Sequence, residues 1–248
     1  MESLIKLENV EKIYKLENVK IKALNKISLD IYKNDFVAIL GPSGSGKSTI
    51  VNMIGCLDVP TNGTIYLKGH DIAKLSESSL AEIRGKTTGF VFQSFNLIPT
   101  LTAIENVLLP SIFVSKKPFP NFSKKFDQNE KSFQEKNDEE VSSKNKAKLL
   151  LEKVELGHRL YHKPNQLSGG EKQRVAIARS LINDPEVIIA DEPTGNLDSK
   201  TGKEIMNLLT KLHDKEKKTI VLVTHDLELA KTAKRKVYIK DGKIIQDN

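Results

Sequence analysis

The sequence predicts an α/β protein built on a mixed sheet whose central strands run parallel. Three short runs, 36–40, 187–190 and 219–223, are rich in aliphatic and β-branched residues, and polar residues follow each of them at once. Such runs are typical of strands buried on both faces, as in a parallel sheet covered by helices. Two other segments, 27–31 and 64–67, alternate apolar and polar residues, which predicts half-exposed strands.

The other elements follow from local patterns. A helical stretch is expected over 50–55, and amphipathic helices are expected over 147–154 and 172–179. A closing hairpin is predicted over 237–245, where Asp-Gly separates two short apolar segments. Residues 115–145 are rich in Lys, Asn, Ser, Glu and Asp and show no sustained period. We therefore expect a flexible insert there, with a docked helix carrying its four Phe residues as the alternative.

Composition excludes several classes of protein. The chain has 248 residues, 38% of them hydrophobic, and a net charge of +7, which suits a packed core rather than wholesale disorder. The one cysteine, Cys56, excludes an internal disulfide framework and a thiolate-rich zinc site, and we expect it to be buried. The basic residues are scattered, which is typical of a solvated surface, although attraction to anionic lipid or nucleic acid stays open.

No apolar run approaches the roughly 20 residues that a membrane span needs. The first residues, Met-Glu-Ser, do not begin a signal peptide. These observations predict a soluble and cytoplasmic chain.

The strongest chemical signal follows the strand 36–40. Residues 41–49 fit the pattern G-x-x-x-x-G-K-[ST] and precede a predicted helix. Its glycines let backbone N–H groups turn inward around phosphate oxygens, and the helix N-terminus adds positive potential. Lys47 supplies a charge for the β- and γ-phosphates, and the Ser48 hydroxyl is placed to ligate Mg²⁺. The predicted triphosphate site comprises Gly41, Pro42, Ser43, Gly44, Ser45, Gly46, Lys47, Ser48 and Thr49.

Polar residues at the ends of two further strands extend this site. The run 187–190 leads directly into Asp191 and Glu192. In proteins with such a phosphate loop, an acid at the tip of a neighbouring strand holds Mg²⁺, a role that fits Asp191. The next carboxylate, Glu192, is placed to orient and deprotonate an attacking water. His225 follows the third strand, where we expect it to contact the γ-phosphate or to align Glu192 and the water.

A second anion site is predicted at 167–171, Leu-Ser-Gly-Gly-Glu, which precedes an amphipathic helix. Ser168 and Glu171 have the spacing of a capping box. Local stability does not explain Gly169 and Gly170, because glycine is a poor helix former. Glycines do offer unhindered N–H groups to an anion at a positive helix end. Since the chain already has one phosphate loop, a second anion site suggests a phosphate that arrives from another molecule.

Together these motifs resemble the nucleotide-binding subunits of ABC transporters over nearly all of the chain except 115–145. The resemblance implies that 41–49 is the Walker A loop, that Asp191 and Glu192 are the Walker B pair, and that 167–171 is the signature. It also implies a P-loop ABC-type ATPase core with an inserted helical subdomain. The core then comprises 1–87 and 166–248, and the subdomain comprises 88–165.

The same resemblance assigns further residues. Gln93, in Phe-Val-Phe-Gln-Ser, is the Q-loop glutamine, which contacts Mg²⁺ and senses a permease. Tyr14 falls where an aromatic ring stacks on adenine, Asp198 ends the D-loop 196–198, and His225 is the switch histidine. The metal ligands implied are Ser48, Gln93 and Asp191, and the catalytic residues are Lys47, Glu192 and His225.

The resemblance further implies a homodimer in which each ATP lies between the Walker A loop of one chain and the signature of the other. The residues that bind ATP from the second chain are then Leu167, Ser168, Gly169, Gly170, Glu171 and Asp198. Since one chain cannot bring its own signature to its own loop, we expect hydrolysis to depend on dimerisation.

Finer features, in 54–58, 89–97 and 190–198, resemble the macrolide-exporter and lipoprotein-releasing ATPases. They imply an ATPase that energises a separate permease, at the inner face of the membrane, for export or extraction of lipoprotein, peptide or drug. Cell-division ATPases share much of this pattern, so a regulatory role on a membrane scaffold stays an alternative. A soluble ATPase acting on nucleic acid fits less well, and no specific nucleic-acid partner is expected, because the chain has neither tandem cassettes nor a long coiled coil.

One position departs from the family pattern. The fifth signature residue is commonly Gln, whereas this chain has Glu171. A carboxylate beside an incoming γ-phosphate would repel it, so we hypothesise that the capping box holds Glu171 away.

Overall fold

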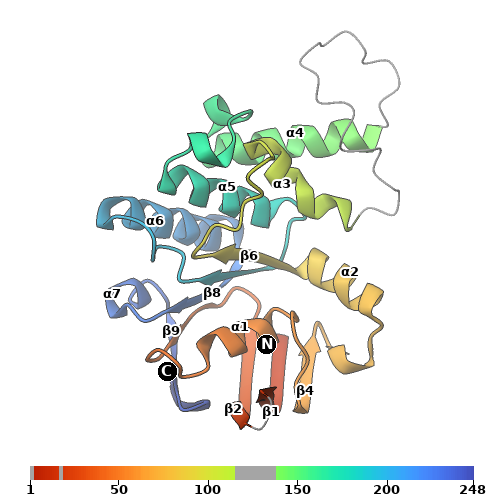
Figure 1. The fold of residues 1–248 in the computed structure, drawn as a ribbon, viewed down its shortest axis with the longest axis vertical. Helices are drawn as coiled ribbons and strands as arrows, with labels where there is room; N and C mark the ends of the chain where they lie inside the picture. Colours follow the sequence, from red (N-terminus) through yellow and green to blue (C-terminus); the bar gives the residue numbers. More distant parts are fainter. Residues whose placement is uncertain (1–2, 17–18, 115–137) are drawn as a thin grey trace.

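The computed structural model describes residues 3–16, 19–114 and 138–248 (Figure 1). The strands are β1 (Ser3–Leu16), β2 (Val19–Tyr32), β3 (Phe36–Leu40), β4 (Asn62–Leu67), β5 (His70–Asp71), β6 (Thr88–Phe92), β7 (Val187–Asp191), β8 (Thr219–Thr224), β9 (Arg235–Lys240) and β10 (Lys243–Asp247). The α-helices are α1 (Lys47–Ile54), α2 (Glu77–Thr87), α3 (Ala103–Ile112), α4 (Asp138–Lys153), α5 (Gly169–Leu181), α6 (Ser199–Glu216) and α7 (Leu227–Ala230). The 3₁₀-helices are η1 (Ile72–Lys74), η2 (Gly157–Arg159) and η3 (Pro164–Gln166).

The described strands form two sheets. One has six strands in the order β10-β9-β3-β8-β7-β6. Its neighbours pair in parallel except β9 and β10, which form the expected antiparallel hairpin. This confirms the mixed sheet with a parallel centre. The alternating segments do not join that sheet, because β2 and β4 pair with β1 in a separate antiparallel sheet of order β2-β1-β4-β5.

The central strands are buried on both faces, as their continuous apolar runs predicted. In β3, Phe36, Ala38 and Leu40 pack into a cluster with residues of α3, α4, α5 and α6. The alternate residues Val37 and Ile39 pack on the opposite face, against α1 and the four-stranded sheet. Figure 1 shows the same division, with α3, α4 and α5 gathered on one side of β6 and β8, and with α1, β1, β2 and β4 on the other. The six-stranded sheet is therefore the middle of three layers.

Helix α4 begins earlier than the sequence predicts. The segment expected to be a flexible insert, 115–145, is helical from Asp138 onward. Residues 141–146 are exposed or half-buried, so hydrophobic periodicity gives no signal there, and the helix is anchored further along by the buried Ala147 and Leu151. The rest of the insert, including its four Phe residues, lies outside the described residues.

The boundary of the helical subdomain also differs from the prediction in one respect. Residues 88–92, which we assigned to that subdomain, form β6 and pair in parallel with β7. Val91 is fully buried in the helix-side cluster, which is the cluster that Phe36, Ala38 and Leu40 form with α3, α4, α5 and α6. This strand is therefore an edge strand of the six-stranded sheet. The remainder of the division into core and subdomain stays a prediction.

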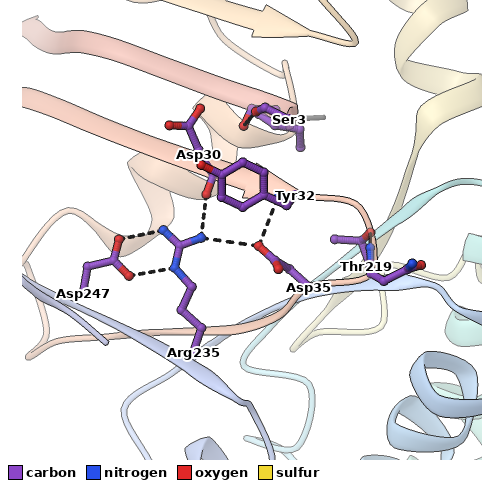
Figure 2. A network of polar contacts seen from close by, with 9 residues as sticks. Ser3, Asp30, Tyr32, Asp35, Thr219, Arg235 and Asp247 are labelled. Carbon is purple, nitrogen blue, oxygen red and sulfur yellow. Dashed lines mark hydrogen bonds and ion pairs between the residues drawn. The ribbon is translucent and has the colours of Figure 1, made fainter. Parts of the chain in front are cut away.

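A polar network links the two sheets (Figure 2). Arg235 of β9 donates to both carboxylate oxygens of Asp247 in β10, at 2.7 and 2.6 Å, and to the carbonyl oxygen of Asp30 in β2 at 2.7 Å. It also contacts the carboxylate of Asp35 at 3.3 Å, which accepts the backbone N–H of Tyr32. The hydrogen bond to Asp247 raises the pKa of Arg235. The guanidinium therefore holds β2 against the closing hairpin.

The sequence also led to expectations about Cys56 and about membrane-spanning segments. Cys56 is 1% exposed, and burial raises the pKa of its thiol to about 12, as expected for a cysteine that packs as an apolar side chain. Within the residues that the structure describes, no helix combines the length and apolar character that crossing a bilayer requires.

Candidate active site

The predicted site residues meet because the parallel strands end together. Leu40 at the end of β3 pairs with Thr224 of β8, and Asp191 of β7 pairs with Val223 of β8 and with Phe92 of β6. Parallel strands present their carboxyl ends at one edge of the sheet, which is where α/β proteins bind ligands. The residues that directly follow these strand ends are therefore brought to the same edge: Gly41, His225, Glu192 and Gln93.

The phosphate loop lies between β3 and α1. Gly46 is the N-cap residue of α1, with φ of +104°, and no side chain among the described residues caps this helix end. The first turn also contains no acidic residue. The N–H groups of the first turn therefore remain available to an anion, and the helix dipole favours a negative charge there. The Nζ of Lys47 donates to the carbonyl oxygens of Gly41 and Pro42, at 2.8 and 2.9 Å, so the lysine lies along its own loop.

Close packing fixes the path of this loop. A Cβ at Gly41 would lie 2.3 Å from the carbonyl oxygen of Ile239 in β9, and one at Gly46 would lie 2.7 Å from that of Ala23 in β2. The loop is therefore enclosed between the closing hairpin and the four-stranded sheet, and only glycine fits at both positions. The Oγ of Ser45 is buried without a hydrogen-bond partner in the described residues, and a Cβ at Gly41 would lie 2.6 Å from it, so this unsatisfied polar atom belongs to the loop.

Glu192 and His225 form a close pair across the ends of β7 and β8. The Oε1 of Glu192 and the Nδ1 of His225 are 2.8 Å apart. The backbone N–H of Glu192 donates to the carbonyl oxygen of Val223, and Glu192 adopts a left-handed conformation with φ of +46°. The carboxylate is 18% exposed, whereas the imidazole is 72% exposed. A partly desolvated carboxylate oriented by an accessible histidine is the arrangement expected of a general base.

Asp191 lies in a different electrostatic environment. Burial raises the pKa of its carboxyl group, and the neighbouring charge of Glu192 raises it further, while Lys47 opposes this shift. A buried carboxylate beside a like charge is stabilised by a cation. The predicted donors of Ser48, Gln93 and Asp191 are all oxygen atoms, which are the ligands that Mg²⁺ prefers. The residues present therefore fit a magnesium ion. Among the described residues no cluster of three or more His, Cys, Asp and Glu side chains offers a metal site made of these residues alone.

Gln93 contacts the segment that follows Glu192. Its Nε2 donates to the Oδ1 of Asn196 at 3.3 Å, and the Nδ2 of Asn196 donates to the carbonyl oxygen of Gln93 at 3.0 Å. Asp198 accepts the backbone N–H groups of Lys200 and Thr201 and so caps α6. Its hydrogen bond from the Thr201 hydroxyl lowers the pKa of this carboxyl group. Local capping therefore accounts for an acid at position 198, and its predicted contact with the second ATP stays a prediction.

The signature segment begins α5 with the predicted capping box. The Ser168 hydroxyl accepts the backbone N–H of Glu171 at 3.2 Å, and the Glu171 carboxylate accepts the backbone N–H of Ser168 at 2.8 Å. The other carboxylate oxygen accepts the Nε of Arg159 at 3.1 Å, a contact that sequence reasoning missed. The hydrogen bond from the Ser168 N–H is the main cause that lowers the pKa of Glu171. Leu167 differs from its neighbours because its side chain is buried in the helix-side cluster.

Tyr14 lies in β1, a strand of the four-stranded sheet, and not at the ends of the parallel strands. The Nζ of Lys12 lies 5.1 Å from the centroid of its ring, and its hydroxyl donates to Asp58 at 3.4 Å. Its stacking on adenine stays a prediction.

Two further residues of α5 contact the segments that follow β6 and β7, and sequence reasoning did not single them out. The Nε2 of Gln173 donates to the carbonyl oxygen of Pro193 at 2.7 Å, although Gln173 is fully buried. Arg179 donates to the carbonyl oxygens of Phe95 and Asn96, both of which are left-handed residues of the Gln93 loop. Helical spacing does place Gln173 on the same face as the apolar Ala176 and Ile177, so a buried polar side chain was detectable there.

Comparisons with known proteins identify the family to which this chain is similar. Residues 24–195 match the family model described as ABC transporter. An ABC transporter ATP-binding protein of Thermotoga maritima is 47% identical over 98% of this chain and 94% of its own length. The solved structure of the ATP-binding cassette MJ0796 of Methanocaldococcus jannaschii, dimeric and bound to ADP and Pi, has a TM-score of 0.83 and 46% identity, covering 98% of this chain and 97% of that one.

A third relative is longer. The macrolide export ATP-binding/permease protein of Bdellovibrio bacteriovorus is 46% identical over 98% of this chain, which spans 34% of that relative's length.

Proposed function

The chain belongs to the ABC transporter family, and on that premise we propose that it binds and hydrolyses ATP between two copies of itself to energise a membrane permease for export. The observation that carries this proposal is the close pair of Glu192 and His225, 2.8 Å apart, at the same sheet edge as the phosphate loop. A carboxylate oriented by a histidine at this edge supports the proposal that Glu192 activates a water molecule.

We assign each residue of this edge one step in hydrolysis. The N–H groups of the first turn of α1 and the ammonium of Lys47 bind the phosphates and neutralise charge that develops during transfer. Glu192 accepts a proton from the attacking water, and His225 keeps the carboxylate in its orientation. Asp191 with Ser48 and Gln93 would hold a magnesium ion, which supplies charge neutralisation on the phosphate oxygens.

The proposed dimer follows from the capping box of α5. A Cβ at Gly170 would lie 2.5 Å from the Cγ2 of Thr201 in α6, so close packing within the chain already requires this glycine. Ser168 keeps its hydroxyl at the helix end as the N-cap, where the N–H groups of the first turn favour an anion. We propose that this helix end meets the triphosphate bound by the partner chain. The relative that is dimeric and bound to ADP and Pi supports the dimer in this proposal.

The proposed transport direction rests on the relatives. The macrolide export relative is named as an ATP-binding and permease protein, and this chain covers only 34% of it. The Thermotoga maritima relative, 94% of which is covered, is named as an ATP-binding protein. We propose that the partner of this chain is a membrane permease carried by another polypeptide, which would place this chain at the inner face of the membrane. Lipoprotein, peptide or drug is the proposed class of cargo.

Replacement of Glu192 by Gln tests the proposal. The E192Q variant should bind ATP and accumulate as an ATP-bound dimer, because the amide keeps the shape of the site but cannot accept the proton. We expect turnover to fall by a factor of about 100 or more, the usual contribution of a general base. Phosphate release and gel filtration with ATP measure the two effects.

The matched control is E216Q, because Glu216 is the last residue of α6, at the helix end away from the segment that follows Glu192. Its carboxylate bonds Lys153 rather than any residue of the strand ends, so this variant should hydrolyse ATP like the unchanged chain. If E192Q retains full turnover, the assignment of Glu192 is wrong.

A further inference from the structure

The Gln93 side chain lies against a short segment that begins at Glu192. Asn196 contacts Gln93 twice, accepting its side-chain amide at 3.3 Å and donating to its backbone carbonyl at 3.0 Å. A Cβ at Gly195 would lie 2.6 Å from the Nε2 of Gln93 and 3.0 Å from its Cδ. Gly195 therefore lets the glutamine lie directly over the backbone, and Asn196 fixes it there.

This segment is itself held at both ends. The backbone N–H of Gly195 donates to the carbonyl oxygen of Glu192 at 3.0 Å, and that of Leu197 donates to Thr194 at 3.0 Å. At its far end, the Asp198 carboxylate caps α6 by accepting two backbone N–H groups and the Thr201 hydroxyl. Two consecutive turns thus connect the residue that contacts Gln93 to the residue that contacts His225. Gln93 therefore contacts the same short backbone segment to which Glu192 belongs.

We propose that Asn196 is a positioning residue that couples the orientation of Gln93 to that of Glu192. This inference rests on the proposed roles of Gln93 and Glu192 in ATP hydrolysis. Asn196 holds the glutamine amide by one hydrogen bond and the Gln93 backbone by another, so both the side chain and the loop are fixed relative to Glu192. A displacement of Gln93 away from Asn196 would break both hydrogen bonds together, and the turn that begins at Glu192 would lose its neighbour.

A double-mutant cycle with N196A and Q93A tests this inference. If Asn196 acts through Gln93, N196A alone should lower turnover roughly three- to tenfold, the effect of one or two hydrogen bonds. The same change made in the Q93A background should lower turnover no further. N196A should also raise the Mg²⁺ concentration that gives half-maximal turnover.

A readout without nucleotide accompanies the kinetics. The side-chain amide of Gln93 should give a ¹⁵N–¹H resonance that is identified by its absence in Q93A. We expect this resonance to shift in N196A and to keep its position in N207A, because Asn207 is an exposed residue of α6. N207A should also hydrolyse ATP at the original rate.

The outcomes separate this inference from the proposed function. If Q93A lowers turnover and N196A leaves both turnover and the amide resonance unchanged, the inference alone fails. Losses that multiply independently in the double variant also overturn it. If Q93A itself turns over normally, both the role of Gln93 and the coupling are wrong.

Discussion

Glu171 illustrates how a single acidic side chain is accommodated at a helix end that is proposed to meet a phosphate. Both of its carboxylate oxygens are engaged, one by the backbone N–H of Ser168 and the other by Arg159. These contacts direct the charge back into the cap of α5. The structure therefore supplies the geometry that our hypothesis about this position requires.

We expect E171Q to hydrolyse ATP within about twofold of the unchanged chain, because glutamine also serves in a capping box. A large gain in turnover or ATP affinity would show that the carboxylate does oppose the phosphate.

Stability against pH gives an independent test of the same contacts. The pKa of Glu171 lies below its ordinary value of 4.5. A lowered pKa means that the ionised form stabilises the folded state above the unfolded pKa, and that this contribution disappears as the pH falls through the folded value. Melting curves between pH 6 and pH 3 should therefore show E171Q below the unchanged chain at pH 6, with a difference that closes below about pH 4.5.

The network around Arg235 joins strands from two sheets (Figure 2). We expect R235M to lower the free energy of unfolding by about 2–3 kcal/mol, because it leaves Asp247 and Asp35 without their shared cation. Methionine retains the apolar stem, which limits the loss from packing. Urea titration measures the change. The exposed pair of Lys231 and Glu228 provides the control, and K231A should change stability by less than about 0.5 kcal/mol.

The elements that sequence reasoning predicted share one property, which is a pattern contained within a few consecutive residues. The run 36–40 indicates burial on both faces, and Asp-Gly indicates a hairpin. The phosphate loop and the capping box are equally local. The separation of β1, β2 and β4 into their own sheet is different, because alternation indicates one covered face and does not say which strands pair.

The contacts that sequence reasoning missed join residues far apart in the chain. Asn196 meets Gln93 across 103 positions, and Arg179 reaches Asn96 across 83. Arg159 meets Glu171 after only 12 positions, but a turn and η3 separate them and neither periodicity nor capping rules describe that path. The arrangement of β6, β7 and α5 brings the first two of these pairs together.

In the proposed dimer, each site takes Lys47 from one chain and Ser168 from the other. Two inactive variants should then restore each other when mixed. K47A removes the positive charge that is proposed to bind the phosphates. S168D keeps an N-cap residue but adds a negative charge where the phosphate would arrive. A mixed dimer has one doubly altered site and one unaltered site.

Because random pairing makes half of the dimers mixed, we expect the mixture to reach about a quarter of the unchanged activity. Phosphate release from equal amounts of the two proteins, with each alone as control, measures this recovery. A mixture as inactive as its components would contradict the shared site.

The uncapped N-terminus of α1 has a consequence for the lifetime of the chain in a cell. Gly46 has no side chain that could accept an N–H group of the first turn, so a bound polyphosphate would satisfy the N–H groups that a capping side chain usually satisfies. A ligand present at a hundred times its Kd adds about 2.7 kcal/mol to the stability of the folded state. In a cell with little ATP, less of this chain would be bound to nucleotide, so its free energy of unfolding would fall and proteases would digest it more easily. In a cell with ample ATP the chain would stay in its more stable bound form. Resistance to heat or to digestion would thus serve as a gauge of the energy supply.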